Sequence, residues 1–440
     1  MNNLVNRMPP GARALFEAKL RQKSAAKQYT VPTLPRSGEA QAFAQSFAQQ
    51  RLWFLCQWEP HSAFYNISSA LKLEGELDVA TFERCINEIV KRHESLRTSF
   101  TTQGNEAVQI IHPSADVKVS FVDLRGFSPS ERDAEMRRLA AEESERPFDL
   151  SRAPLIRVLL LQLEDMRYVT LTTLHHIISD GWSIGVFYRE VAALYQAFAR
   201  SEPFSLSELP IQYPDYAVWQ RGHLSEEVLK PQLAYWKKQL SGAPPLLELP
   251  TDRPRPGLQS FKGARLSRML DKALLDAVKT VGQADRATLF MTLLAAFSVL
   301  LSRCCRSDDI VIGSPIAGRT RTETEHLIGF FVNTLTLRTD LSGDPSFRDL
   351  LSRVRETALS AYSHQDLPFE KLVEELKPER SLSYSPLFQV MFVLQNTTQV
   401  PLRLPGLKVE RLELGRETSR FDLSLYAIET SEGLKLSFEY

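Results

Sequence analysis

Most of the reactive potential of this chain lies in residues 174–183, LHHIISDGWS. His175 and His176 end a run of apolar and branched residues, and neighbouring side chains of a strand point to opposite faces. We therefore expect one imidazole to face a cleft and the other to be structural. Imidazole has an unperturbed pKa of about 6.5, which suits proton transfer near neutral pH. Asp180 comes four residues after His176, and Gly181 allows the backbone to approach a ligand closely.

Other interpretations of the same segment stay open. The histidines can be satisfied by backbone groups while Asp180 only caps a helix. Gly181, Ser183 and Gly185 also fit the GxSxG pattern of a serine hydrolase, with a strand before and a helix after. Its base would come from His223, His326 or His364. Against a hydrolase, a serine at a helix start is usually a cap, and the paired histidines would have no role.

A metal site is the weakest interpretation. The chain has no HExxH, and adjacent histidines on a strand diverge. The remaining histidines show no ligand spacing. We therefore expect no metal.

The residues around this segment predict the elements that position it. Residues 155–163 and 168–176 indicate a strand hairpin, and residues 184–198 have a helical period. A helix at residues 82–93 has one apolar face and begins after Asp78, a suitable cap. The five prolines of residues 241–263 predict a connector between two halves. In the second half we expect helices at residues 288–303, 345–362 and 368–376, and strands at residues 310–313, 330–337 and 388–394, with a hairpin at 421–440.

The composition is that of an ordinary globular protein. The 440 residues carry 53 Lys and Arg against 53 Asp and Glu, and 43% are hydrophobic. That length predicts two or three folded units. A net charge of zero removes the general attraction to nucleic-acid phosphates, so no nucleic-acid partner is expected.

Neither a membrane span nor a secretory signal is expected. The longest apolar stretch, residues 289–301, is 13 residues long, whereas a span needs about 20, and we expect a buried helix there. Charge is scattered through the N-terminal residues, which lack the apolar core of a signal peptide. The four cysteines form neither a disulfide framework nor CxxC knuckles, so we expect a reducing cytoplasm.

Seven segments, in order, resemble motifs of the condensation domains of nonribosomal peptide synthetases. HHIISDG matches the family's HHxxxDG motif. The six further matches are SFAQQRLWFL (46–55), RHESLRTSF (92–100), YPDYAVW (213–219), IGFFVNTLTLR (328–338), HQDLPFE (364–370) and RSLSYSPL (380–387). The last segment departs from the family at Ser381 and Ser385, which bears on loop contacts rather than on chemistry. The paired histidines are intact, unlike those of the heterocyclising relatives.

The resemblance implies an α/β (α+β) fold of two lobes similar to chloramphenicol acetyltransferase. They would form a V-shaped pseudo-dimer with a tunnel between them. We expect an N-terminal helix and linker at residues 1–40, outside the core fold, and lobes at residues 41–210 and 211–440. Family members normally continue past Tyr440 into one more helix.

The resemblance also implies roles for individual residues in an acyltransferase that forms amide bonds. His176 would be catalytic, His175 and Asp180 would support the loop, and Gly181 would border the tunnel. Asp180 would pair with Arg92, with Arg97 as the second candidate. Substrate or tunnel contacts are expected from Trp182, Ser183, Asn333, Tyr213 and Trp219. Packing at the lobe junction is the favoured alternative for Tyr213 and Trp219, and a satisfied amide is the alternative for Asn333.

The implied partners are donor and acceptor peptidyl carrier domains and an adjoining adenylation domain. The carriers would dock on opposite faces and deliver substrates on 4'-phosphopantetheine arms, so no permanently bound cofactor is expected. If Met1 is the native start, the donor is a fatty acyl group, as acyl-CoA or acyl carrier, or a peptide from a separate synthetase. We lean to a starter domain that begins a lipopeptide, with chain elongation as the alternative. A short helix with Leu15, Phe16 and Leu20 would serve as linker or docking element in either case.

Overall fold

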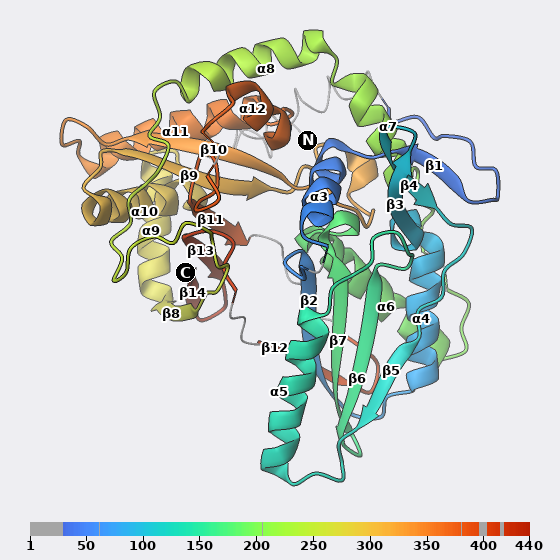
Figure 1. The fold of residues 1–440 in the computed structure, drawn as a ribbon. Helices are drawn as coiled ribbons and strands as arrows, with labels where there is room; N and C mark the ends of the chain where they lie inside the picture. The colour runs from blue at the N-terminus through green and yellow to red at the C-terminus, as the bar shows by residue number, and fades with distance from the viewer. Residues whose placement is uncertain (1–29, 61, 205, 380, 396–402, 414–417) are drawn as a thin grey trace, which may run out of the picture.

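The computed structural model describes residues 30–440 apart from residues 61, 205, 380, 396–402 and 414–417. Two lobes lie side by side, each built of a central sheet with helices against it (Figure 1). α7 (Tyr213–His223) and α8 (Glu226–Gln239) run along the top of this view from the first lobe to the second. The mixed α/β fold agrees with the predicted class.

The first lobe contains a five-stranded sheet in the order β12-β2-β7-β6-β5 and a three-stranded sheet in the order β1-β4-β3. Its elements are β1 (Gln41–Ala44), α3 (Phe47–Trp58), β2 (Asn66–Glu74), α4 (Val79–Arg92), η1 (Glu94–Arg97), β3 (Thr98–Gln103), β4 (Glu106–Ile111), β5 (Val119–Asp123), α5 (Pro129–Glu145), β6 (Ile156–Glu164), β7 (Arg167–His175), η2 (His176–Ile178) and α6 (Gly181–Ala199).

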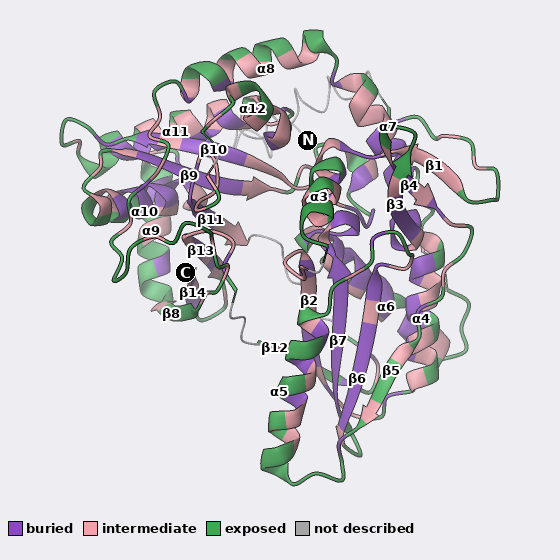
Figure 2. Ribbon diagram, in the orientation of Figure 1, coloured by how far each residue is buried: buried purple, intermediate pink, exposed green. Residues whose placement is uncertain are grey.

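The predicted hairpin is confirmed as β6 and β7, which pair antiparallel with Ile156 opposite Leu174. Because side chains alternate along a strand, β6 sends Leu160 into the core shared with α4 and α6. It sends Leu159 and Leu161 to the opposite face, against α5. Both faces are therefore covered, and Figure 2 shows these two strands buried along most of their length.

The helix predicted at residues 82–93 is α4. Its N-cap is Asp78, whose carboxylate accepts a hydrogen bond from the backbone N–H of Thr81. The predicted apolar face is buried, and Cys85 and Ile86 are fully enclosed. α6 packs beside α4 and begins directly after the histidine segment.

The second lobe contains a six-stranded sheet in the order β10-β9-β11-β13-β14-β8. Its elements are β8 (Arg265–Asp271), α9 (Lys272–Ala284), α10 (Leu289–Cys305), β9 (Asp309–Ile316), η3 (Thr322–Thr324), β10 (Asn333–Asp340), α11 (Phe347–Ser363), α12 (Phe369–Leu376), β11 (Val390–Gln395), β13 (Leu423–Glu429) and β14 (Gly433–Glu439). The three predicted helices and the final hairpin are confirmed, with ends that differ by a few residues. Within the described part of the chain, no single helix is long and apolar enough to cross a membrane, and α9 with α10 meets that criterion only as a pair bent by 101°.

One predicted strand begins too early. We expected a strand from residue 330, but β10 starts at Asn333. The residues just before it bond instead to side chains of the first lobe, including Asp180, which accepts a hydrogen bond from the backbone N–H of Phe331. These residues therefore link the lobes rather than extend the sheet.

β12 (Lys408–Leu412) was not predicted; it leaves the second lobe and pairs antiparallel with β2. Lys408 lies opposite Glu74 and Leu412 opposite Ala70. The first lobe's sheet is thus completed by a strand from near the end of the chain. The predicted boundary at residue 210 stays a prediction, and no single residue range describes this sheet.

The proline-rich residues 241–263 contain no helix or strand, as predicted, but they do not connect the lobes. Trp236 before them, Leu247 within them and Leu275 after them pack in one core, that of the second lobe. The prediction of a connector between halves is therefore wrong for this segment. The chain crosses between the lobes earlier, through α7 and α8.

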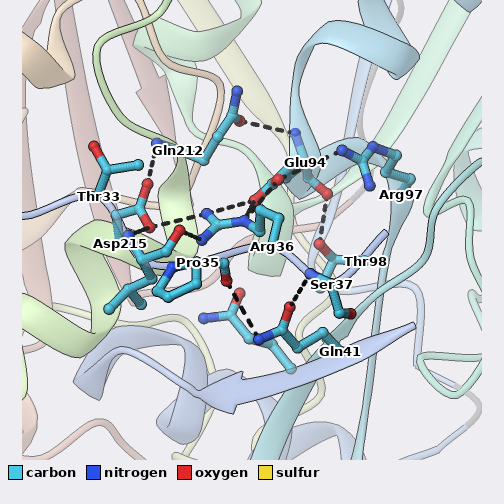
Figure 3. A network of polar contacts seen from close by, with 12 residues as sticks. Thr33, Pro35, Arg36, Ser37, Gln41, Glu94, Arg97, Thr98, Gln212 and Asp215 are labelled. Atoms are coloured by element: carbon cyan, nitrogen blue, oxygen red, sulfur yellow. Dashed lines mark hydrogen bonds and ion pairs between the residues drawn. The ribbon is translucent and has the colours of Figure 1, made fainter. Parts of the chain in front are cut away.

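The prediction that residues 1–40 lie outside the core is wrong for the part that the structure describes. The predicted helix with Leu15, Phe16 and Leu20 lies outside the described residues. Val31 is buried beside Tyr213, and the guanidinium of Arg36 binds Glu94 (2.9 Å) and Asp215 (2.9 Å) (Figure 3). Glu94 follows α4 and Asp215 lies in α7, so this segment ties the first lobe to the crossing helix.

Candidate active site

His175 is buried and His176 partly exposed, but only His175 belongs to the strand, because β7 ends there and η2 begins at His176. His175, the last residue of β7, is only 2% exposed. Its Nδ1 accepts a hydrogen bond from the backbone N–H of Ile177 (3.2 Å), so in the neutral ring Nε2 carries the proton and faces the sulfur of Cys56 (3.6 Å). Burial lowers the pKa of His175 to about 3, so the imidazole stays neutral. Its contacts fit a structural role.

His176 is the partly exposed imidazole. Its Nδ1 lies 2.9 Å from the backbone oxygen of Ser179. A carbonyl oxygen can only accept, so Nδ1 carries the proton and Nε2 is the basic nitrogen. The ring of Phe330, from the second lobe, meets the imidazole edge-on with centroids 4.8 Å apart. His176 therefore has a defined tautomer and lies where both lobes meet.

Asp180 does not pair with either predicted arginine. Its Oδ1 lies 3.2 Å from Nη2 of Arg319, and the two side chains are 0% and 2% exposed. Arg92 binds Glu190 (3.0 Å) instead, and Arg97 lies near Glu94. Asp180 caps the start of α6, whereas Glu190 lies ten residues further on, about 15 Å along the helix. The end of α4 therefore reaches Glu190 and not Asp180.

The carboxylate of Asp180 has further partners. It accepts hydrogen bonds from the backbone N–H of Ser183 (2.8 Å) and that of Phe331 (3.0 Å). The hydroxyl of Ser183 lies 2.7 Å from the same carboxylate. Asp180 thus joins the N-terminus of α6, a buried arginine and a segment of the second lobe. This is the structural kind of pairing that we expected, with a different cation.

The three residues after Asp180 differ in their surroundings. Gly181 is exposed, and apart from its chain neighbours and the backbone of its own helix no atom lies within 4 Å of the position that a Cβ would take. Trp182 is partly buried and donates from Nε1 to the backbone oxygen of Glu325 (2.9 Å). Gly181 therefore borders open space, and Trp182 links α6 to the second lobe.

The burial of Ser183 contradicts the hydrolase alternative. A nucleophile elbow presents its hydroxyl to substrate, but Ser183 is 0% exposed. Its Oγ lies within 3.0 Å of the backbone N and O of Gly329 and of Nη2 of Arg319. The proposed bases contact other residues, since His223 stacks on Trp219 and His364 stacks on Tyr235. His326 is exposed and lines a cavity that does not include Ser183. Ser183 therefore serves structure.

Asn333 forms four hydrogen bonds. Its Nδ2 donates to the backbone oxygens of Gln365 and Leu367, and its Oδ1 accepts from the backbone N–H of Thr334 and of Phe369. These bonds fill the capacity of the amide. The alternative of a satisfied amide therefore fits the structure, and Asn333 ties β10 to the chain that leads into α12.

Tyr213 and Trp219 lie at the lobe junction. Tyr213 is 1% exposed, packs against Phe331, and donates from its hydroxyl to the backbone oxygen of Phe330 (2.6 Å). Trp219 is partly buried and lies under the guanidinium of Arg321 at 4.2 Å. The contacts favour junction packing for both residues over contact with substrate.

Sequence reasoning missed Arg319 and the polar residues that hold residues 328–331. Arg319 follows β9 within the sequence IAGRT. The only signal was general: a buried carboxylate needs a cation. Among the described residues, no group of three or more His, Cys, Asp or Glu is placed to hold a metal ion.

Two cavities among the described residues lie away from His176. A cavity of about 530 Å³ is lined by residues of α4, α6 and the chain that leads to α7, including Lys91 and Leu206. A smaller one of about 150 Å³ adjoins it and shares Arg92. Since neither is lined by His176, the tunnel between the lobes stays a prediction.

Solved structures with the same two-lobed fold extend over nearly the whole chain. The X-domain from teicoplanin biosynthesis matches with a TM-score of 0.83 and 28% identity over 94% of this chain and 92% of that one. The first condensation domain of the calcium-dependent antibiotic synthetase matches with a TM-score of 0.77 over 91% of this chain and 90% of that one. At 20% identity, this second likeness shows the fold alone. The two matches place this chain in the class of two-lobed folds that condensation domains share.

The sequence model of the condensation domain matches residues 39–440, and this chain belongs to that family. Two large proteins of the linear gramicidin synthase of Brevibacillus parabrevis are similar to it, one at 53% identity over 96% of this chain and the other at 56% over 92%. The chain spans only 5% and 8% of the length of those two relatives. Condensation domains are acyltransferases that form amide bonds in nonribosomal peptide synthetases, as the resemblance implied.

Proposed function

We propose that this chain joins the amine of an aminoacyl group to an acyl or peptidyl thioester. Both groups arrive on 4'-phosphopantetheine arms of carrier domains, which act as substrates and not as resident cofactors. The placement of His176 carries the proposal. Its imidazole lies between Ser179 of the first lobe and Phe330 of the second, with Nε2 as the basic nitrogen.

The reaction needs a nitrogen nucleophile and a route for one proton. The amine nitrogen attacks the thioester carbonyl carbon, the C–S bond breaks, and the thiolate leaves with the proton that the amine gives up. His176 Nε2 accepts that proton or holds the amine by a hydrogen bond. A general base contributes about 10²–10⁴ in rate, or roughly 3–5 kcal/mol, whereas ordering two reactants contributes about 7–11 kcal/mol. Positioning is the larger contribution.

His176→Ala is therefore expected to lower turnover without abolishing it for every substrate pair. Turnover within about twofold of wild type under saturating carrier would remove His176 from the mechanism. His175 and Asp180 act in this proposal by holding the loop, and Gly181 borders the space that substrate enters.

We favour a peptidyl or aminoacyl donor, hence chain elongation, over lipoinitiation. The relatives at 53% and 56% identity belong to a synthase for linear gramicidin, and a domain of such a synthase would work with carrier and adenylation domains. The preference for a starter domain depended on Met1 as a native start and on apolar composition. No described feature of the structure adds to either point. A cytoplasmic location is part of the same proposal.

The test is a condensation assay read by mass spectrometry. An aminoacyl acceptor carrier is offered an aminoacyl or peptidyl carrier, a fatty acyl carrier, or fatty acyl-CoA in turn. We expect the amide product on the acceptor carrier with the first donor. A product only with fatty acyl donors would replace elongation by lipoinitiation, and free acid formed without the acceptor amine would contradict condensation.

A further inference from the structure

Residues 328–331 (IGFF), here called the bridge segment, belong to the second lobe by sequence but pack in the first. The side chain of Ile328 is 1% exposed and lies in the first lobe's core. A Cβ on Gly329 would come within 2.0 Å of the ring of Tyr213, so only glycine fits this approach. The bridge segment therefore sits in a closely fitted socket.

Buried side chains of the first lobe bind the backbone of the bridge segment. Ser95 donates from Oγ to the backbone oxygen of Ile328 (2.7 Å), and Nδ1 of His93 accepts from the N–H of the same residue (3.3 Å). Oγ of Ser183 accepts from the N–H of Gly329 (3.0 Å). Two consecutive residues are thus fixed by side chains that are at most 2% exposed.

The backbone of Phe330 and Phe331, the other half of the bridge segment, is also bound by buried side chains. The hydroxyl of Tyr213 donates to the backbone oxygen of Phe330 (2.6 Å), and Asp180 accepts from the N–H of Phe331 (3.0 Å). Both of these side chains are also at most 1% exposed. Backbone that is hydrogen-bonded to buried side chains at four consecutive residues has little freedom to shift. The Cα of Phe330 is therefore held from both sides.

Phe330 is the residue of the bridge segment whose side chain contacts the imidazole of His176. Its ring meets the imidazole of His176 at 4.8 Å between centroids and 63° between planes. The contact of Nδ1 with the backbone oxygen of Ser179 fixes one edge of the imidazole. A ring packed against the imidazole resists its rotation about the Cβ–Cγ bond.

We propose that Phe330 is a positioning residue for His176. The hydrogen bonds of the bridge segment hold Phe330 in place, and its ring in turn holds the imidazole in one orientation. This inference depends on the proposed function, in which Nε2 must be oriented to accept the proton of the amine or to hold the amine by a hydrogen bond. Proton transfer needs a heavy-atom distance of about 2.6–3.2 Å, and a shift of about 1 Å at a reacting group can cost about 10²-fold in rate. Phe330 therefore acts on turnover and not on carrier binding.

The first test compares Phe330→Leu, which keeps an apolar side chain without the ring, with Phe330→Tyr, which keeps the ring. Phe290→Leu is the matched control, since Phe290 is partly buried and stacks on Phe392 in the second lobe. We expect Phe330→Leu to lower kcat about 10- to 100-fold with the KM for the acceptor carrier within about twofold. Phe330→Tyr should recover most of kcat, and Phe290→Leu should leave it within about twofold. Equal losses in Phe330→Leu and Phe290→Leu would overturn the proposal, and so would no loss in Phe330→Leu.

A second test needs no substrate and so separates this proposal from the proposed function. Nitrogen-15 histidine spectra report the tautomer of His176, assigned by the signals lost in His176→Gln. We expect the Nδ1–H form in the wild type and a mixture of tautomers in Phe330→Leu, with Phe330→Met as the substitute if that variant fails to fold. An unchanged tautomer in the variant would overturn the positioning role. A changed tautomer in a protein that forms no amide would refute the proposed function alone.

Discussion

Asp180→Asn is expected to destabilise the fold strongly, because it leaves the buried guanidinium of Arg319 without its counter-charge. The two side chains are 0% and 2% exposed, and their closest atoms are 3.2 Å apart. Asparagine is as good an N-cap as aspartate and has nearly the same volume, so cap and packing are kept. Removing one partner of a buried pair costs about 3–5 kcal/mol. That is a large fraction of the stability of a typical domain.

The assay is urea unfolding followed by intrinsic fluorescence, analysed for the first transition because two lobes need not unfold together. Asp123→Asn is the control, since the Asp123–Arg125 pair is about half exposed and its loss should not be measurable. The double variant Asp180→Asn, Arg319→Met should be less destabilised than the sum of the single variants. Specific activity per folded molecule should fall less than folded yield. An Asp180→Asn protein within about 1 kcal/mol of wild type, or additive single effects, would refute the reasoning.

Three further outcomes are expected. The pKa of buried His175 is lowered to about 3. Between about pH 3 and about pH 6.5 this histidine therefore binds more protons in the unfolded chain than in the folded one. The free energy of unfolding falls as the pH drops through that window. His175→Gln should reduce that slope, measured by urea unfolding, by up to about 1.4 kcal/mol per pH unit, and equal slopes would contradict the assignment. Ser183 should resist fluorophosphonate reagents, and Ser183→Ala should lose about 1–3 kcal/mol of stability because buried groups lose their partner; rapid labelling would revive the hydrolase. On α3, Phe54 and Trp58 are 59% and 75% exposed one turn apart, which suits an apolar contact with a carrier domain. Trp58→Glu should raise the KM for that carrier about tenfold with kcat unchanged, whereas Met166→Glu, at a similarly exposed position in the β6–β7 turn, should not; equal KM values would exclude α3 from docking.

Local periodicity was enough to predict the elements that surround the histidines. The apolar spacing of residues 82–93 predicted α4, and the apolar, branched run before the histidines predicted β7, although β7 ends at His175 and His176 begins η2. The strand β12 was missed for a physical reason. Its sequence, KVERL, is short and mixed, and its pairing with β2 depends on contacts that no local pattern encodes.

The partner of Asp180 shows the same limit in the site. The sequence indicated that a buried carboxylate after the paired histidines needs a cation, and Arg92 at the end of a predicted helix was the expected partner. Helix geometry then directs Arg92 to Glu190, while the chain after β9 brings Arg319 to Asp180. Pairing between residues so distant in sequence follows from tertiary structure, as does the socket for the bridge segment.

Strand β12 also has a consequence for synthesis of the chain. Lys408 of β12 lies opposite Glu74 of β2. During synthesis β2 therefore has no partner on this edge until nearly all of the 440 residues have left the ribosome. Until then the backbone N–H and C=O groups along that edge are open to pairing with another nascent chain. A ribosome that stalls before residue 408 would therefore release a first lobe with an uncovered strand, prone to aggregate.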